Sequence, residues 1–86
     1  MDALTKLPNI GKTLANKLTL VGITNLYELK EVGSENALVK ISTLEKHEVC
    51  LNLLYALEGA IQGIRWHGLT KERKQELKEF YQLLKL

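Results

Sequence analysis

Cysteine, proline and aspartate are almost absent from this chain of 86 residues, which has one of each: Cys50, Pro8 and Asp2. A single cysteine excludes an intramolecular disulfide, which favours a reducing compartment. One proline and six glycines exclude a low-complexity linker. A hydrophobic content of 45% is too high for a disordered chain. We therefore expect one folded domain over residues 1–86.

Long hydrophobic runs are also missing. The longest candidate, Val49–Leu57, is far shorter than the roughly 20 apolar residues that a membrane-spanning helix needs. Near the start of the chain, Lys6 and Pro8 come before the apolar region of a signal peptide could form. We therefore expect a cytoplasmic protein that has no membrane partner.

Catalytic and metal-binding motifs are not recognisable. No serine has an identifiable His–Asp partnership, and there is no paired-carboxylate site or P-loop. His47, Glu48 and Cys50 could ligate a metal, but His67 would lie roughly 30 Å away along the same predicted helix. We expect no enzyme activity, metal, cofactor or small-molecule substrate, and we interpret Cys50 as a small core residue.

Charge of one sign is not in marked excess. Twelve basic and ten acidic residues give a net charge of +2, too mild to indicate nucleic-acid binding by itself. Residues 1–22 and 69–86 each carry a net charge of +2, and the residues between them carry −2. Lysines and glutamates alternate in the last segment, which favours a solvated face; a second basic patch is the alternative.

Helical periodicity is what the sequence does contain, because apolar residues recur three and four positions apart and no segment alternates like a β-strand. The pattern predicts helices over residues 2–6, 11–20, 25–32, 35–41, 46–66 and 71–85. We expect N-caps at Thr24, Ser34 and Thr70, and glycines at the helix ends. The predicted fold is a compact all-α bundle of five or six helices around the long one.

Aromatic residues make up only 6% of the chain. We expect Trp66 to anchor the junction between the long helix and the last one; the alternative is that Arg65–His67 forms a recognition or stacking patch. Tyr27 and Tyr55 are expected to be partly buried, with their hydroxyl groups at the surface.

The segment Leu7–Leu18 carries the functional signal. A short helix ends at the proline, a tight turn follows, and a second helix begins at once. The first turn of a helix has amide groups without partners and a partial positive charge, which suit a phosphate. Gly11 lets the backbone approach a ligand closely, and Asn9 tolerates a positive φ. Ile10 is expected to anchor the turn in the core.

This segment resembles a helix-hairpin-helix motif, whose hairpin typically reads Leu-Pro-Gly-Ile-Gly. Such motifs bind the DNA backbone without sequence preference, through the amide groups of the hairpin and a nearby lysine. The resemblance implies this role for Asn9, Gly11, Lys12 and Thr13, with Lys17 one turn further along. The chain departs from the pattern at Asn9, which replaces the first hairpin glycine.

The whole chain resembles the C-terminal domain of TfoX/Sxy-type competence regulators. The matching stretches are Leu7–Gly11, Leu14-Ala15, Val21–Ile23, Leu26–Leu29, Val32-Gly33, Leu51–Glu58, and Trp66 with Leu69. The resemblance implies an N-terminal helix-hairpin-helix in an architecture like that of SAM domains. It also implies membership of a family that is linked to induction of DNA-uptake genes, where this domain often follows an N-terminal domain.

Two functions remain open from the sequence. The first is a non-catalytic bacterial regulatory module that binds the backbone of DNA weakly through the hairpin. The alternative is a protein-interaction adaptor, docked on a separate regulatory domain or on itself, in which the hairpin is structural. The alternative is motivated by leucines for which a small core has little room. They are Leu51, Leu69, Leu83 and Leu86.

Overall fold

The computed structural model describes residues 3–44 and 49–84, and within these ranges the chain forms five α-helices, two 3-10 helices and no strand. The elements are η1 (Ala3–Lys6), α1 (Lys12–Leu20), α2 (Leu26–Val32), α3 (Ser34–Ser42), α4 (Leu51–Gln62), η3 (Trp66–Gly68) and α5 (Lys71–Leu84). The prediction of an all-α fold is confirmed.

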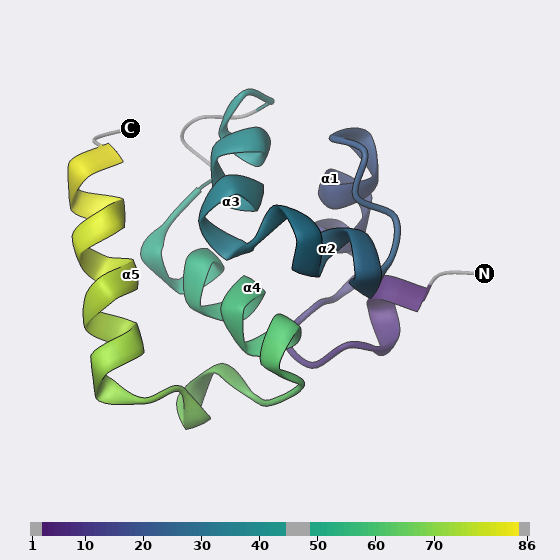
Figure 1. Ribbon diagram of the computed structural model, residues 1–86. Helices are drawn as coiled ribbons and strands as arrows, with labels where there is room; N and C mark the ends of the chain where they lie inside the picture. The colour runs from purple at the N-terminus through teal and green to yellow at the C-terminus, as the bar shows by residue number, and fades with distance from the viewer. Residues whose placement is uncertain (1–2, 45–48, 85–86) are drawn as a thin grey trace.

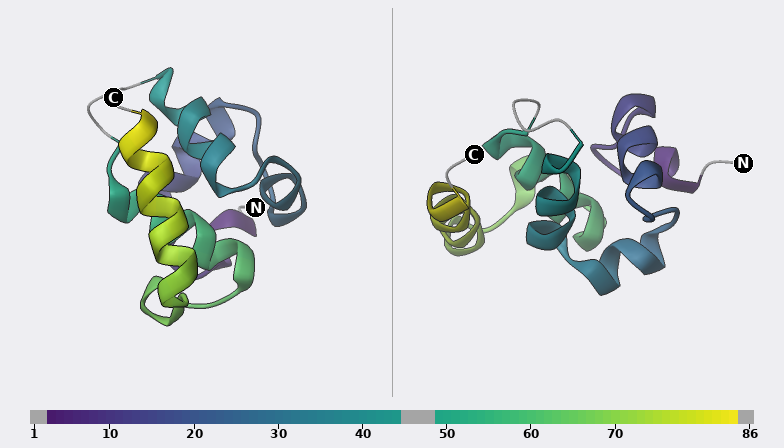
Figure 2. Two further views of the ribbon diagram at one scale, coloured as in Figure 1. Left: turned by 60° about the vertical axis from the view of Figure 1, so that its left-hand side comes forward. Right: turned by 90° about the horizontal axis from the view of Figure 1, so that it is seen from above.

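Helix α4 lies in the middle of the molecule and contacts α2, α3, η3 and α5 (Figure 1). Helix α5 runs along one side, and α1 lies on the opposite side together with η1 (Figure 2). The first and last basic segments are therefore on opposite sides of the molecule. A footprint centred on the start of α1 therefore does not by itself include a basic patch on α5.

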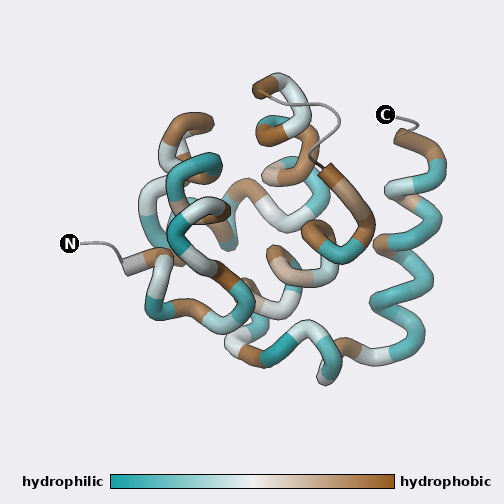
Figure 3. Tube along the Cα trace, turned by 180° about the vertical axis from the view of Figure 1, so that it is seen from behind, coloured by the Kyte–Doolittle hydropathy of each residue, from teal (hydrophilic) through white to brown (hydrophobic). Residues whose placement is uncertain are grey.

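Each α-helix contributes buried apolar side chains to the core. The predicted inward residues Ala37, Leu38 and Ile41 of α3 are all fully buried. Helix α5 is mainly hydrophilic along its length (Figure 3), and Leu77 is its one buried residue. Burying a leucine of this kind contributes roughly 1.5–3 kcal/mol of transfer free energy. Leu69, which we expected to lack room inside, is buried, whereas Leu83 is exposed.

The predicted helix over residues 46–66 is too long at both ends. Helix α4 ends at Gly63, which adopts a left-handed conformation with φ 76°. The amide of Gly63 donates to the carbonyl of Ala60, and the amide of Ile64 donates to that of Gly59 (2.9 Å). These two bonds form a Schellman cap, which turns the chain away from the helix axis. The helix-ending glycine is therefore Gly63 and not Gly68.

The beginning of α4 corrects the interpretation of Cys50. The backbone of this residue is extended (φ −152°), and α4 starts directly after it. Its side chain is exposed rather than part of the core. His47 and Glu48, the other candidate metal ligands of this segment, lie outside the described residues.

The N-cap of α2 lies one residue later than predicted, at Asn25 rather than Thr24. The Asn25 side chain accepts a hydrogen bond from the amide of Glu28 (2.9 Å). The Glu28 carboxylate in turn accepts hydrogen bonds from the amide and the hydroxyl of Thr24, both 2.7 Å. The bond from the Thr24 amide, with that from its hydroxyl, holds the pKa of Glu28 below its ordinary value. This arrangement resembles a capping box shifted by one position.

Replacing the N-cap residue Asn25 with alanine is expected to lower the free energy of unfolding by about 1 kcal/mol, because the amide of Glu28 loses its acceptor. Urea denaturation followed by circular dichroism would measure the change. Asn16→Ala, an exposed position inside α1, is the matched control and should change stability by about half of this or less. Equal losses in the two variants would contradict the capping role.

Two further caps were predicted, and one of them is correct. The Thr70 hydroxyl accepts a hydrogen bond from the amide of Arg73 (3.1 Å), so Thr70 does begin α5. Ser34 was expected to cap α3, but Gly33 precedes the helix with φ 85° and Ser34 is its first residue, fully buried. The Ser34 hydroxyl is directed at another helix, as described below.

Candidate functional site

The predicted hairpin connects η1 to α1. Its apolar residue Ile10 is buried, as expected. Asn9 has φ 71°, the left-handed conformation that its side chain type tolerates better than most. Gly11 directly precedes α1 and is exposed. The chain therefore makes a tight turn that is anchored on one side and open to solvent on the other.

The side chain of Asn9 points into the molecule and ties the hairpin to the end of α4. Its Nδ2 donates to the carbonyl oxygens of Ile64 (3.0 Å) and Ala56 (3.4 Å). Its Oδ1 accepts from the amide of Trp66 (3.2 Å). In Figure 1 the purple hairpin passes beside the end of α4, where the chain continues into η3. Because the Asn9 amide group is occupied inside the protein, only its main chain is left for a ligand.

Gly59 is the residue that lets Asn9 approach α4 so closely. A Cβ atom at position 59 would lie 2.6 Å from Asn9 Nδ2 and 2.8 Å from the carbonyl oxygen of Ile64. Sequence reasoning overlooked this residue. The available signal was a glycine inside a strongly apolar helix, which usually has a packing reason.

The start of α1 presents the other predicted residues to solvent. Lys12 and Thr13 are exposed, and the first turn contains no acidic side chain. Gly11 supplies no side-chain cap to the first amide groups, and the space where its Cβ would lie is open. Gly11, Lys12 and Thr13 therefore come together at one uncapped, basic helix N-terminus.

Lys17 lies one turn further along α1 and is half-buried. Together with Thr13 it lines a mainly apolar pocket of about 330 Å³ between α1 and the start of α4. The other lining residues are Leu14, Cys50, Asn52 and Leu53. Lys17 is thus on the same face of α1 as Thr13 but further from the turn.

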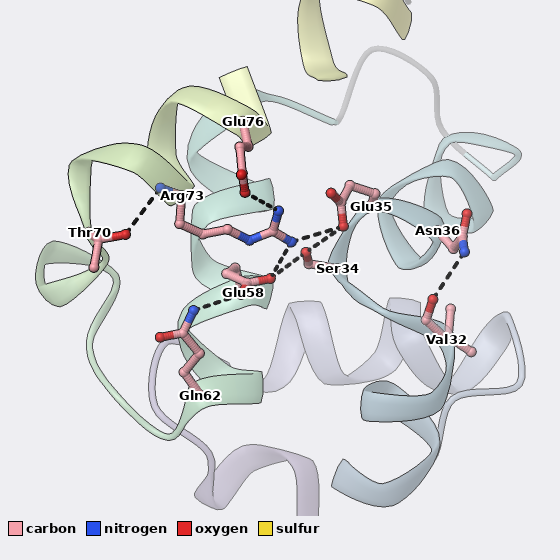
Figure 4. Close-up of polar contacts among 9 residues, drawn as sticks. All are labelled: Val32, Ser34, Glu35, Asn36, Glu58, Gln62, Thr70, Arg73 and Glu76. Carbon is pink, nitrogen blue, oxygen red and sulfur yellow. Dashed lines mark hydrogen bonds and ion pairs between the residues drawn. The ribbon is translucent and has the colours of Figure 1, made fainter. Parts of the chain in front are cut away.

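A polar cluster joins α3, α4 and α5 (Figure 4). Arg73 of α5 donates to the carboxylates of Glu58 (3.0 Å) and Glu35 (3.1 Å) through one nitrogen, and to Glu76 (3.1 Å) through another. The buried Glu58 also accepts from the hydroxyl of Ser34 and from Gln62, both at 2.7 Å. Sequence reasoning did not single out this cluster.

The electrostatics of this cluster favour a charged Glu58. Burial alone raises the pKa of the Glu58 carboxyl, but hydrogen bonds from Arg73, Gln62 and Ser34 and the charge of Arg73 outweigh burial. The net effect lowers its pKa. The bond to Glu58 is also the main cause that raises the pKa of Arg73. The Ser34 hydroxyl donates to a carboxylate and not to an imidazole. The cluster therefore suits a structural link between helices better than a nucleophilic site.

Three rings, one from α4 and two from η3, stack on one another. The ring centroids of Tyr55 and Trp66 are 6.0 Å apart with an interplanar angle of 14°, and those of Trp66 and His67 are 4.0 Å apart at 28°. Lys74 Nζ lies 5.5 Å from the centroid of the Trp66 ring. Tyr55 is half-buried, as predicted, and Trp66 is half-buried too, whereas Tyr27, which was expected to be partly buried, is exposed.

The described helices include none that is both long and apolar enough to span a lipid bilayer. No curated protein matches the chain. Solved structures do match it, including the following two. One is a triclinic crystal form of an uncharacterised protein from Listeria monocytogenes, 53% identical with a TM-score of 0.91, covering 94% of this chain and 91% of that one.

The other is a tetragonal crystal form of a protein of unknown function from Listeria monocytogenes. It is 52% identical, with a TM-score of 0.90, and the match covers 95% of this chain and all of that one. The fold described above is therefore shared over nearly the whole length. The family model for the TfoX C-terminal domain matches residues 1–81. This match covers the hairpin, the polar cluster and the stacked rings, and the chain belongs to the TfoX C-terminal domain family.

Proposed function

We propose that this domain is a non-catalytic module that binds the sugar-phosphate backbone of nucleic acids weakly and without base preference, through the start of α1. The observation that carries the proposal is the open, uncapped N-terminus at Gly11–Thr13, which has a basic residue and no acidic one in its first turn. Helix amide groups and the helix dipole favour a phosphate at such a place.

The anchoring of the hairpin supports the same proposal. A ligand site that is already in its bound conformation loses little conformational entropy when the ligand arrives. Here Ile10 is buried, and three hydrogen bonds of the Asn9 side chain hold the turn against α4 and η3. The amide groups of Gly11 and Lys12 are thus presented by a fixed turn.

The expected footprint is small. Two or three phosphate contacts give a slope of about −2 to −3 for the logarithm of the binding constant against the logarithm of salt concentration. Helix α1 contains no arginine, so the bidentate recognition of guanine that gives base specificity is not expected from it. Helix α5 runs along the opposite side of the molecule from α1 (Figure 2), so its lysines are not counted among these contacts.

Replacing Lys12 with glutamate is expected to weaken binding to a short DNA duplex about tenfold at low salt, because one phosphate contact is lost and a repulsive charge is added. Fluorescence anisotropy of a labelled duplex at low and at physiological salt would measure the affinity. Lys78→Glu makes the same change of net charge at an exposed position of α5 and should alter affinity about twofold at most.

Equal losses with Lys12→Glu and Lys78→Glu would mean that only net charge matters, and would contradict a site at the hairpin. No binding at low salt by the unmodified protein would overturn the proposal altogether. The protein-interaction adaptor would then be the remaining candidate function. Its structural support is the exposure of apolar side chains on three helices, namely Leu20 (73%), Tyr27 (76%) and Leu83 (83%).

A further inference from the structure

Five residues form a surface that the hairpin proposal does not use. They are Tyr55, Arg65, Trp66, His67 and Lys74, and we call them the aromatic patch. The rings of Tyr55 and His67 both stack against that of Trp66. Lys74 Nζ lies 6.0 Å from the Tyr55 centroid and 5.5 Å from that of Trp66, so its ammonium group is a positive charge beside the stacked rings.

The patch is both fixed and accessible. Tyr55 and Trp66 are half-buried and pack against the core, which holds their rings in place. His67 and Arg65 are exposed on either side of Trp66 in the chain. A ring stack that is already formed and has an exposed member offers a flat surface to a planar ligand at little cost in side-chain entropy.

The patch is joined to the hairpin through the backbone. Asn9 Oδ1 accepts a hydrogen bond from the amide of Trp66 (3.2 Å), and Asn9 Nδ2 donates to the carbonyl of Ile64 (3.0 Å). Asn9 is therefore in direct contact with the residue that carries the central ring of the stack. For one strand to bind both places, it must run from the hairpin past this contact to the rings.

The charge around the rings suits an anionic strand. Residues 65–74 carry four basic side chains and a single acidic one, Glu72. Arg73 is directed at Glu35 and Glu58 and so is neutralised inside the polar cluster (Figure 4). Arg65 and Lys71 are exposed, and Lys74 is half-buried beside the rings. Phosphates next to a stacked base would meet these cations.

We propose that the aromatic patch stacks an unpaired base, so that the domain prefers single-stranded nucleic acid to duplex. Every base has a flat face, so stacking on an aromatic ring binds a single strand with little sequence preference. In a duplex the faces of the bases are covered by their neighbours, so stacking is unavailable and this domain keeps only its phosphate contacts. This inference rests on the proposed function, because the hairpin supplies the adjacent phosphate contacts.

Trp66 is the only tryptophan of the chain and reports directly on the patch. Titration with oligothymidylate should quench its fluorescence, whereas a duplex of the same length should leave it nearly unchanged. The single strand should bind about fivefold more tightly or better, as expected for stacking of one base. His67→Ala, an exposed change, should remove most of this preference and leave duplex affinity as it was. Tyr27→Ala, an exposed aromatic residue of α2, is the matched control and should keep the preference.

The outcomes separate this inference from the hairpin proposal. Equal affinities for single strand and duplex, without quenching, overturn the stacking role even if Lys12→Glu still weakens both. Quenching and single-strand preference that are lost in His67→Ala support the patch, whatever Lys12→Glu does to the duplex. Absence of binding to either nucleic acid overturns both proposals and leaves the patch to a protein partner.

Discussion

Replacing Gly59 with alanine is expected to lower the free energy of unfolding by about 3 kcal/mol, although alanine is the better helix former. Inside a helix the change would ordinarily gain up to about 1 kcal/mol. Here the new Cβ would lie 2.8 Å from the backbone oxygen of Ile64 and 3.2 Å from Trp66 Cα. Backbone atoms cannot rotate away as the end of a flexible side chain can, so the segment after α4 must shift.

That shift would also break polar contacts. The same Cβ would lie 2.6 Å from Asn9 Nδ2, which donates to Ile64. Moving the segment away from α4 stretches this bond and the one from Trp66 to Asn9. Overpacking typically costs about 1–3 kcal/mol, and each lost hydrogen bond adds about 1 kcal/mol. The two costs together exceed the gain in helix propensity.

The matched control is Gly68→Ala. A Cβ at position 68 would lie 3.5 Å from the side chain of Ile64, an ordinary contact, and this glycine does not need a positive φ. Thermal and urea denaturation of both variants would measure the difference. If Gly59→Ala is as stable as Gly68→Ala, the close packing of Asn9 against α4 does not stabilise the fold.

The same variant tests whether the anchoring of the hairpin matters for its proposed function. Amide hydrogen exchange in residues 9–13 should accelerate in Gly59→Ala more than exchange in α5, because the tie to α4 and η3 is broken first. Exchange that accelerates equally everywhere would indicate global destabilisation alone.

The predictable parts of this fold depend on neighbours in the sequence. The stripe of α3 follows from residues three and four apart, and Ala37, Leu38 and Ile41 are indeed buried. The end of α1 was predictable for a similar reason. Gly22 has φ 88°, and Ile23 donates to the carbonyl of Leu18 in the cap that such a glycine allows.

The ends of α4 were not predictable in this way. Apolar periodicity continues on both sides of the helix, but Gly63 ends it in a left-handed conformation, and the carbonyl of Ile64 then accepts a hydrogen bond from Asn9, which is 55 residues away in sequence. Cys50 was similarly assigned to a helical stripe although it stands in extended backbone before the first turn. Both errors come from contacts and conformations that periodicity does not encode.

The residues of the candidate site could be predicted from the sequence, but the direction in which the Asn9 side chain points could not. The exposed position of Lys12 and Thr13 at a helix start follows from the local pattern around Pro8 and Gly11. The inward direction of Asn9 does not, because its partners Ala56, Ile64 and Trp66 belong to another part of the chain. One signal for the polar cluster was present, namely the charged Glu58 within the apolar run of α4.

Replacing Arg73 with alanine is expected to lower the free energy of unfolding by about 3 kcal/mol at neutral pH. The Glu58 side chain is only 10% exposed, and Arg73 is its cationic partner at 3.0 Å. Removing one member of a buried ion pair leaves the other charge buried without compensation, which typically costs about 3–5 kcal/mol. Arg73 is 27% exposed, so we take the lower end of this range.

The pH dependence should identify Glu58 as the cause. In the unmodified protein its pKa is lowered by the cluster, so its stabilisation is present above the unfolded-state pKa of about 4.3 and is lost as the pH falls through the folded-state value. In Arg73→Ala the burial of the carboxyl remains while the largest opposing contribution is gone, so its pKa should rise from its value in the unmodified protein. The stability difference between the two proteins should therefore be largest near neutral pH and shrink as the pH falls toward 4.

Two further variants separate the buried charge from a general loss of packing. Lys78→Ala removes an exposed cation from the same helix and should change stability by less than about 0.5 kcal/mol. Glu58→Gln combined with Arg73→Ala removes the uncompensated charge and should recover part of the stability lost in Arg73→Ala. A double variant that is less stable than Arg73→Ala by the full effect of Glu58→Gln alone would show no coupling between the two side chains. In that case Arg73 would hold α5 against α3 and α4 through its packing and its bond to Glu35, and the charge of Glu58 would contribute little.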